Sequence, residues 1–133
     1  MSSLEKVLLG GSVAIVAFDA LASAAAVRRG FPYAAAPLGA FLIYAAVGFR
    51  AVRAGKGGVR IGALVGAAMG LVDATLGWAV SRAIAPEVSP TDVTVPRWMM
   101  VAVMVVLTGA IFGALGGFLA RRSRTPVAHA DRR

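Results

Sequence analysis

Residues 98–120 read WMMVAVMVVLTGAIFGALGGFLA, a run without a charged side chain. A helix needs about 20 apolar residues to cross the hydrocarbon core of a bilayer, so this stretch alone predicts a membrane-spanning helix. Three further apolar runs precede it, and we place them at residues 7–27, 34–49 and 61–84. The strands of a membrane barrel would alternate in polarity. These runs do not alternate, so all four are expected to be helices.

The composition leads to the same class of protein. Hydrophobic residues make up 59% of the 133 residues and charged residues only 15%, whereas about a quarter of a soluble domain is charged. A soluble fold of this length could not bury so much apolar surface, so the excess must face lipid. We therefore expect an all-α integral membrane protein, with a four-transmembrane-helix bundle over residues 1–122 and a disordered basic cytoplasmic tail over residues 123–133.

The distribution of Lys and Arg predicts the orientation. The side that holds both termini and the loop between the second and third helices carries Lys6, Arg50, Arg53, Lys56, Arg60, Arg121, Arg122, Arg124, Arg132 and Arg133, against Arg28, Arg29, Arg82 and Arg97 on the other. Cytoplasmic loops carry the excess of Lys and Arg, so both termini are expected in the cytoplasm. The expected location is a cell membrane, and the Arg- and Ala-rich composition favours a bacterial inner membrane. The one-sided bias also predicts that any homo-oligomer is parallel.

Anionic lipid headgroups are the partner that the basic clusters favour. The net charge of +8 is divided into short clusters between long apolar runs, which argues against nucleic acid as a partner. Each basic side chain near an anionic surface contributes about 1 kcal/mol. We expect Arg121, Arg122 and Arg124 to contact such lipids.

The first apolar run has a second interpretation. Lys6, the run itself and the small residues around Ser23 resemble a cleavable signal peptide. Cleavage would leave three helices in the mature protein. Asp19 inside the run, and Arg28 and Arg29 directly after it, argue for retention of the helix.

A sequence pattern relates the first helix to the third. An Asp followed by Arg after nine residues and by Pro after thirteen occurs from Asp19 and again from Asp73. This repeat predicts two parallel αα-hairpins related by an axis along the membrane normal. The alternative is coincidence in an Ala-rich chain.

Asp19 and Asp73 lie near the centres of their predicted helices and at similar depth. A charged side chain there costs about 2.5–3.5 kcal/mol on insertion scales, and no Lys, Arg or His shares that depth. Each acid must therefore be protonated, hydrogen-bonded, hydrated or bound to a cation. One hypothesis is a proton- or cation-binding pair. The other is two neutral acids that cross-link helices. The candidate hydroxyl partners are Ser12, Ser23, Tyr44, Thr75 and Thr108.

Glycines mark one face of the third helix and one face of the fourth. They are Gly62, Gly66, Gly70 and Gly77 in the third helix, and Gly109, Gly113 and Gly117 in the fourth. Stripes of small residues let helix backbones approach closely in lipid. We expect these two stripes to pack against each other and against a small-residue face of the first helix. One stripe could instead serve an oligomer contact or a membrane protein partner.

Motifs of enzymes and metal proteins are missing. The chain has no cysteine and no HExxH, Walker or GxSxG pattern. We expect no enzyme activity, no cofactor and no metal site. Trp78, inside the third helix, could either line a cation site or pack against lipid and helices.

Two functions from different classes fit these features. The first interpretation is a structural or accessory membrane protein that assembles through its glycine stripes, as a glycine zipper, and scaffolds partners. The alternative is a small proton- or cation-coupled transporter or channel that uses Asp19 and Asp73. In gross plan the chain is similar to small multidrug-resistance transporters, which are also short, have four helices and carry an acid in the first. That acid is a glutamate there, whereas this chain has Asp19 and a second acid.

Overall fold

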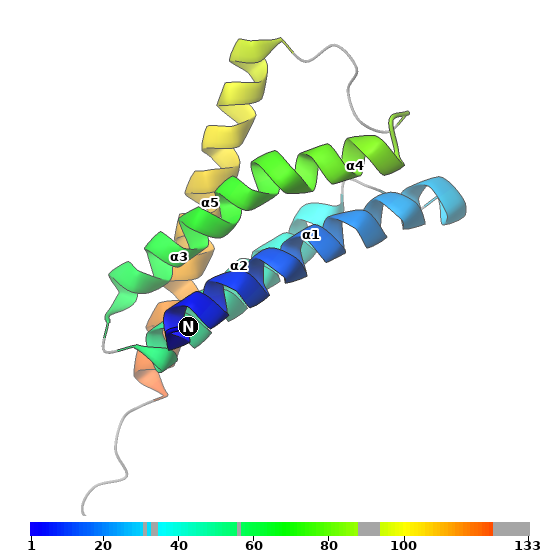
Figure 1. Cartoon of the computed structure of the whole chain (residues 1–133). Helices are drawn as coiled ribbons and strands as arrows, with labels where there is room; N and C mark the ends of the chain where they lie inside the picture. The colour runs from blue at the N-terminus through cyan, green and yellow to red at the C-terminus, as the bar shows by residue number, and fades with distance from the viewer. Residues whose placement is uncertain (31, 33–34, 56, 88–93, 124–133) are drawn as a thin grey trace, which may run out of the picture.

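The computed structural model describes residues 1–30, 32, 35–55, 57–87 and 94–123. Over these residues the chain is helical without strands, and four helical spans are long and apolar enough to cross a membrane. The predicted all-α, four-helix, multi-pass membrane class is confirmed. The first span begins, and the last span ends, at the same end of the molecule, which we call the terminus end (Figure 1).

Most helix ends lie beyond the predicted apolar runs, although the second helix begins at Ala36 rather than at residue 34. Their bounds are α1 Ser3–Arg29, α2 Ala36–Ala54, α3 Val59–Val72, a π-helix η2 Asp73–Gly77, α4 Trp78–Ile84 and α5 Val95–Arg122. The third span comprises α3, η2 and α4. Hydropathy underestimates the length of these helices because their terminal turns carry charged residues. Arg50 and Arg53, which were expected in a loop, therefore lie in the last two turns of α2.

Local sequence signals account for these bounds. At the start of α1, the Ser2 side chain accepts from the Glu5 N–H at 3.2 Å, and the Glu5 carboxylate accepts from the Ser2 N–H at 2.7 Å. This reciprocal pair is a capping box. Gly30, with φ of 62°, ends α1 in the left-handed conformation that glycine adopts without penalty. A proline stands in the first turn of both α2 and α5, where its missing N–H costs no hydrogen bond.

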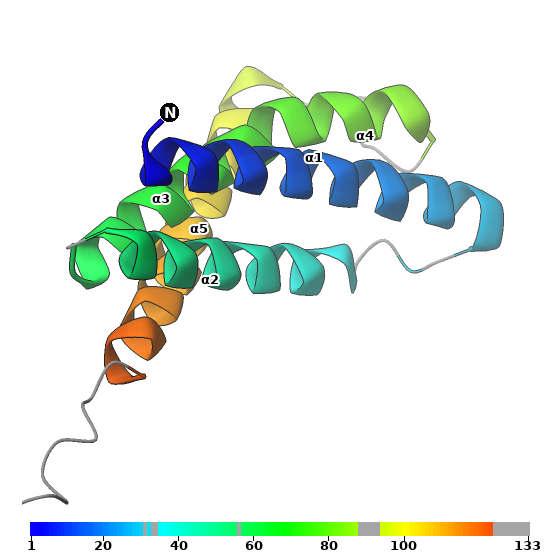
Figure 2. The ribbon, with the colours of Figure 1, turned by 60° about the horizontal axis from the view of Figure 1, so that its bottom comes forward.

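The helices are arranged as a close group from which α5 diverges. Figures 1 and 2 show α1 and α2 antiparallel, with the third span beside them and α5 crossing at a steep angle. Within the described residues, α5 contacts α3, α2 and η2, but none of its Cα atoms lies within 8 Å of one from α1 or α4. The first half of α5 therefore stands apart from α4 at the end of the molecule away from the termini, which we call the opposite end.

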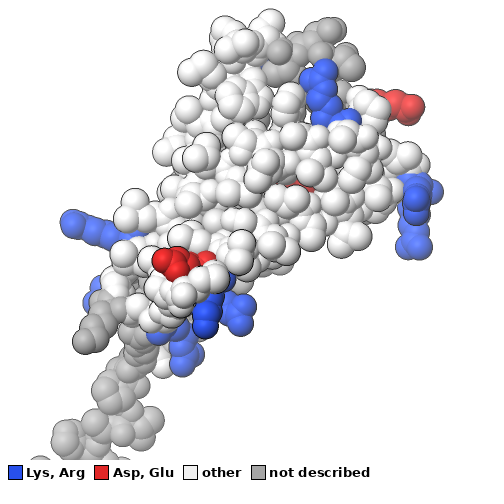
Figure 3. All heavy atoms as spheres, in the orientation of Figure 1, with Lys and Arg blue, Asp and Glu red and all other residues white. Residues whose placement is uncertain are grey.

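The buried core is small, as expected of a protein that faces lipid. Ile15, Tyr44, Val47, Val65 and Met69 form its centre. Large apolar side chains such as Leu21 and Leu42 are more than 70% exposed. Figure 3 shows Lys and Arg at the two ends of the molecule and an almost uncharged band between them, as a membrane-spanning bundle requires.

The predicted glycine faces of α3 and α5 lie against each other. A Cβ added at Gly66 would lie 2.8 Å from the Gly113 Cα, and one added at Gly62 would lie 3.2 Å from the Gly117 Cα. Likewise, a Cβ at Gly109 would lie 3.2 Å from the Gly70 Cα. At this separation only glycine fits, so the two backbones are in direct contact.

The expected contact of α1 is formed with the third span, where Asp19 reaches Gly77, but not with α5. Among the described residues α1 packs on α2 and on the third span, while α2 covers a second face of α5. A Cβ at Gly48 of α2 would lie 2.7 Å from the Gly113 Cα, and one at Gly116 would overlap the Ala45 backbone. The prediction that three small-residue faces pack together was therefore wrong for the pair α1 and α5, because α2 occupies the place beside α5.

Candidate functional site

Asp19 and Asp73 meet at Gly77. A Cβ added at Gly77 would overlap Oδ2 of Asp19 and lie 2.9 Å from Oδ1 of Asp73. The two carboxyl groups therefore occupy the space beside one glycine Cα, close enough to interact electrostatically. Gly77 was predicted as a helix-packing residue. In the structure it makes room for the two acids.

Asp19 belongs to the regular helix α1 and is 8% exposed. Its Oδ2 has no hydrogen-bond partner among the described residues. One turn further on, the hydroxyl of Ser23 is fully buried and is likewise without a partner in the described part of the chain. Buried polar atoms are almost always hydrogen-bonded in proteins, so unsatisfied groups at this depth indicate a place where a proton, water or ligand binds.

Tyr44 of α2 completes the site. Its side chain is 1% exposed, and its Oη donates a hydrogen bond to Oδ2 of Asp73. Tyr44 was one of the hydroxyl partners considered from the sequence. Three separate spans thus each contribute one polar side chain to a single point near the middle of the spans.

A local change of helix type begins at Asp73. The Trp78 N–H donates to the carbonyl of Asp73, five residues earlier, which defines η2 as a π-helix. Thr75 helps to satisfy the carbonyls of this segment, since its Oγ1 donates to the Leu71 carbonyl at 2.7 Å. Short π-helical turns are rare and frequently occur at functional sites. By contrast, α1 is regular at Asp19, so the two copies of the repeated pattern differ in local structure.

The three polar side chains line a cavity of about 600 Å³ that extends toward the opposite end. It exists because the first half of α5 diverges from α4. Aromatic side chains form much of its wall, and Arg97 of α5 lines it as well. Besides Tyr44, the aromatic lining residues are Phe41, Trp78 and Trp98. Its size falls in the range of small-molecule pockets, which is about 300–1,000 Å³.

Trp78 is fixed in this wall by a neighbouring cation. The guanidinium of Arg82 lies over the Trp78 ring, 5.3 Å from its centroid, a distance at which a cation and an aromatic face attract each other. Trp78 therefore lines the cavity, and the cation site considered for it stays a prediction. No pattern in the sequence indicated that Arg97 and Trp98 of α5 would also line the cavity.

The remaining predicted residues lie away from this site. Arg121 and Arg122 are exposed in the last turn of α5, at the terminus end. Arg124 and residues 124–133 of the predicted tail lie outside the described part of the chain. Among the residues that are described, no group of three or more His, Cys, Asp or Glu could hold a metal ion.

Comparison of the chain with protein-family models, with curated proteins and with solved structures finds no match.

Proposed function

We propose that the chain is a small proton- or cation-coupled transporter or channel, whose binding site is the cavity at Asp19 and Asp73. The observation that carries this proposal is the meeting of two carboxyl groups beside Gly77, with one buried oxygen unpartnered, on a cavity of about 600 Å³. Two ionised carboxylates in a medium of low dielectric constant repel each other strongly. The pair is therefore most stable when it holds a proton or a cation.

An organic cation suits this cavity better than a metal ion. Trp78 and Phe41 line the cavity, and an aromatic ring attracts a positive charge. One face of Trp78 lies under Arg82, and Phe41 stacks on Phe112. Apart from Arg97, the remaining wall is largely apolar. A hydrophobic body would lie against these walls while its charged centre approaches Asp19 and Asp73. Because protons and the cation use the same carboxyl groups, they compete, and this competition is the basis for coupling.

Exchange of protons for an organic cation tests the proposal. The full chain would be reconstituted in liposomes, and uptake of ethidium would be followed by fluorescence under an imposed pH gradient. We expect Asp19→Asn and Asp73→Asn to reduce uptake to the level of protein-free liposomes, because Asn keeps the shape but neither binds a cation nor exchanges a proton. Glu87→Gln, which alters an exposed acid at the opposite end, is the matched control and should transport normally. Well-folded Asn variants that still transport would refute the proposal.

A structural or accessory role is the second candidate. The hydrogen bond from Tyr44 to Asp73 joins α2 to the third span, and the direct glycine contact between α3 and α5 supports assembly of the glycine-zipper type. On this account Asn at position 19 or 73 preserves both the fold and the function, since an amide still forms hydrogen bonds. The same pair of variants therefore separates the two candidates.

We further propose that both termini face the cytoplasm of a bacterial cell. At the terminus end, the described basic residues are Lys6, Arg50, Arg53, Arg60, Arg121 and Arg122, against Arg28, Arg29, Arg82 and Arg97 at the opposite end. This excess follows the positive-inside rule. The cavity would then extend toward the outer surface.

A further inference from the structure

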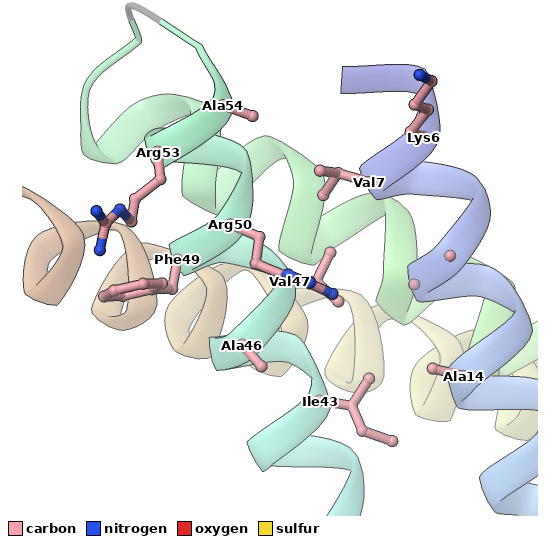
Figure 4. Close-up of a pocket in the computed structure, with 12 residues that line it drawn as sticks. Lys6, Val7, Ala14, Ile43, Ala46, Val47, Phe49, Arg50, Arg53 and Ala54 are labelled. Carbon is pink, nitrogen blue, oxygen red and sulfur yellow. The ribbon is translucent and has the colours of Figure 1, made fainter. Parts of the chain in front are cut away.

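A second hollow, independent of the acid pair, lies between α1 and α2 at the terminus end (Figure 4). Its volume is about 760 Å³, and it shares no lining residue with the cavity at Asp19. Small or aliphatic side chains form its walls, among them Gly10, Ala14, Ile43 and Ala46. At the end of this groove, the Ser3 hydroxyl donates to the Ala54 carbonyl at 3.4 Å, which joins the first turn of α1 to the last residue of α2.

Basic side chains surround the groove at the level of the membrane surface. Lys6 and Arg50 line it from the two opposing helices, and Arg53 adds a third positive charge. Figure 4 shows the Arg50 side chain extending from α2 toward α1, into the groove, while the Arg53 guanidinium lies over the Phe49 ring at 5.7 Å. Glu5, the acid next to Lys6 in the chain, does not line the groove and accepts a hydrogen bond from Ser2.

We infer that this groove binds one anionic phospholipid of the terminus-side leaflet. Its phosphate would lie between Lys6 and Arg50, and an acyl chain would run along Gly10, Ala14 and Ile43 toward mid-membrane. Basic pockets between transmembrane helices are suited to anionic headgroups, and a guanidinium matches the geometry of a phosphate. A lipid fits better than a soluble anion because the groove continues from its basic rim into an apolar trough between two membrane-spanning helices.

Two adjacent glycines show which face of α1 is open for an acyl chain. A Cβ added at Gly10 would meet nothing within 4 Å, whereas one added at Gly11 would lie 2.7 Å from Sδ of Met69 and 3.0 Å from Val47. Both glycines line the groove, but a side chain at position 11 would meet the packed interior, whereas one at position 10 would have open space. A large side chain at position 10 would fill the groove without disturbing the packing of the helices.

Lipid binding by the full chain in detergent tests this inference. The probes are phosphatidylglycerol and phosphatidylcholine with the same acyl chains, measured by native mass spectrometry, together with inorganic phosphate as a competitor. We expect phosphatidylglycerol to bind more tightly than phosphatidylcholine. Lys6→Gln combined with Arg50→Gln should weaken the binding of phosphatidylglycerol about 25-fold, since each basic side chain contributes about fivefold. Gly10→Phe should displace the lipid although the basic residues are unchanged. Arg28→Gln with Arg29→Gln, at the opposite end, is the matched control and should keep the preference.

Three results would overturn the inference. One is equal binding of the two lipids by the unaltered chain. Another is an undiminished preference in the variant without Lys6 and Arg50, provided that circular dichroism shows it to be folded. The third is displacement of the lipid by millimolar phosphate together with no effect of Gly10→Phe, which would identify a site for a soluble anion. Because Asp19 and Asp73 are unchanged in every variant, cation transport should persist throughout.

Discussion

Glycine has different uses in two regions of this protein. At Gly66 and its neighbours the missing side chain admits the backbone of α5, and the helices touch with nothing between them. At Gly77 the missing side chain admits two carboxyl groups, and beyond them α5 diverges and leaves a cavity. The same residue type thus closes one region and opens the other. The role of a glycine in a membrane helix therefore depends on which atoms occupy the space that a side chain would take.

The strongest way to break the closed region is to insert a side chain between α3 and α5. Gly66→Leu should destabilise the fold by about 3 kcal/mol or more, because overpacking a tight contact forces the helices apart. Gly10→Leu is the control, since its side chain would point into open space. Unfolding in mixed micelles with sodium dodecyl sulfate, followed by circular dichroism, measures both. Equal stability of the two variants would show that the close approach of α3 and α5 is not required.

A smaller change at Gly77 tests the open region. The added methyl group of Gly77→Ala would overlap a carboxyl oxygen of Asp19, and that side chain must rotate away. We expect a loss of stability of about 1 kcal/mol and ethidium binding that is about tenfold weaker, measured by fluorescence titration. Gly10→Ala should leave both quantities unchanged. Unaltered ethidium binding in Gly77→Ala would mean that the two acids do not act together.

Removal of the Tyr44 hydroxyl should have the mildest effect. Tyr44→Phe eliminates the hydrogen bond to Asp73, and polar contacts of this kind between membrane helices contribute about 0.6–1 kcal/mol. Stability should fall by that amount in the same micelle assay, while ethidium uptake persists at a reduced rate. If uptake ceases in a variant of normal stability, Tyr44 takes part in proton or cation transfer rather than only holding Asp73.

Most of the contact between α3 and α5 could be predicted from the sequence, but only part of the cavity at Gly77 could. Hydropathy is a local property, so four spans could be placed from it, and helical periodicity placed Gly66 and Gly113 on contact faces. Gly48 was missed because its neighbours four residues away, Tyr44 and Val52, are large and form no small-residue stripe. Its contact with Gly113 depends on how α2 and α5 cross, and a pattern within one helix does not encode that crossing.

At the site, the sequence placed Asp19 and Asp73 at the same depth but did not show that they meet at Gly77. Depth follows from counting residues along each helix, whereas lateral position depends on the packing of all four spans. The π-helix at Asp73 was not predicted either. The π-helix changes the hydrogen bonding of a single turn, and it leaves no mark on the hydropathy of an apolar run.

The most direct test of the central claim is infrared difference spectroscopy of the full chain in reconstituted membranes, before and after addition of an organic cation such as ethidium. The account predicts that the cation removes intensity from the protonated-carboxyl band, and that the change is absent in Asp19→Asn and Asp73→Asn. A carboxyl band that is identical with and without the cation, in a protein shown to be folded, would contradict the account. The acid pair would then be a structural cross-link between helices.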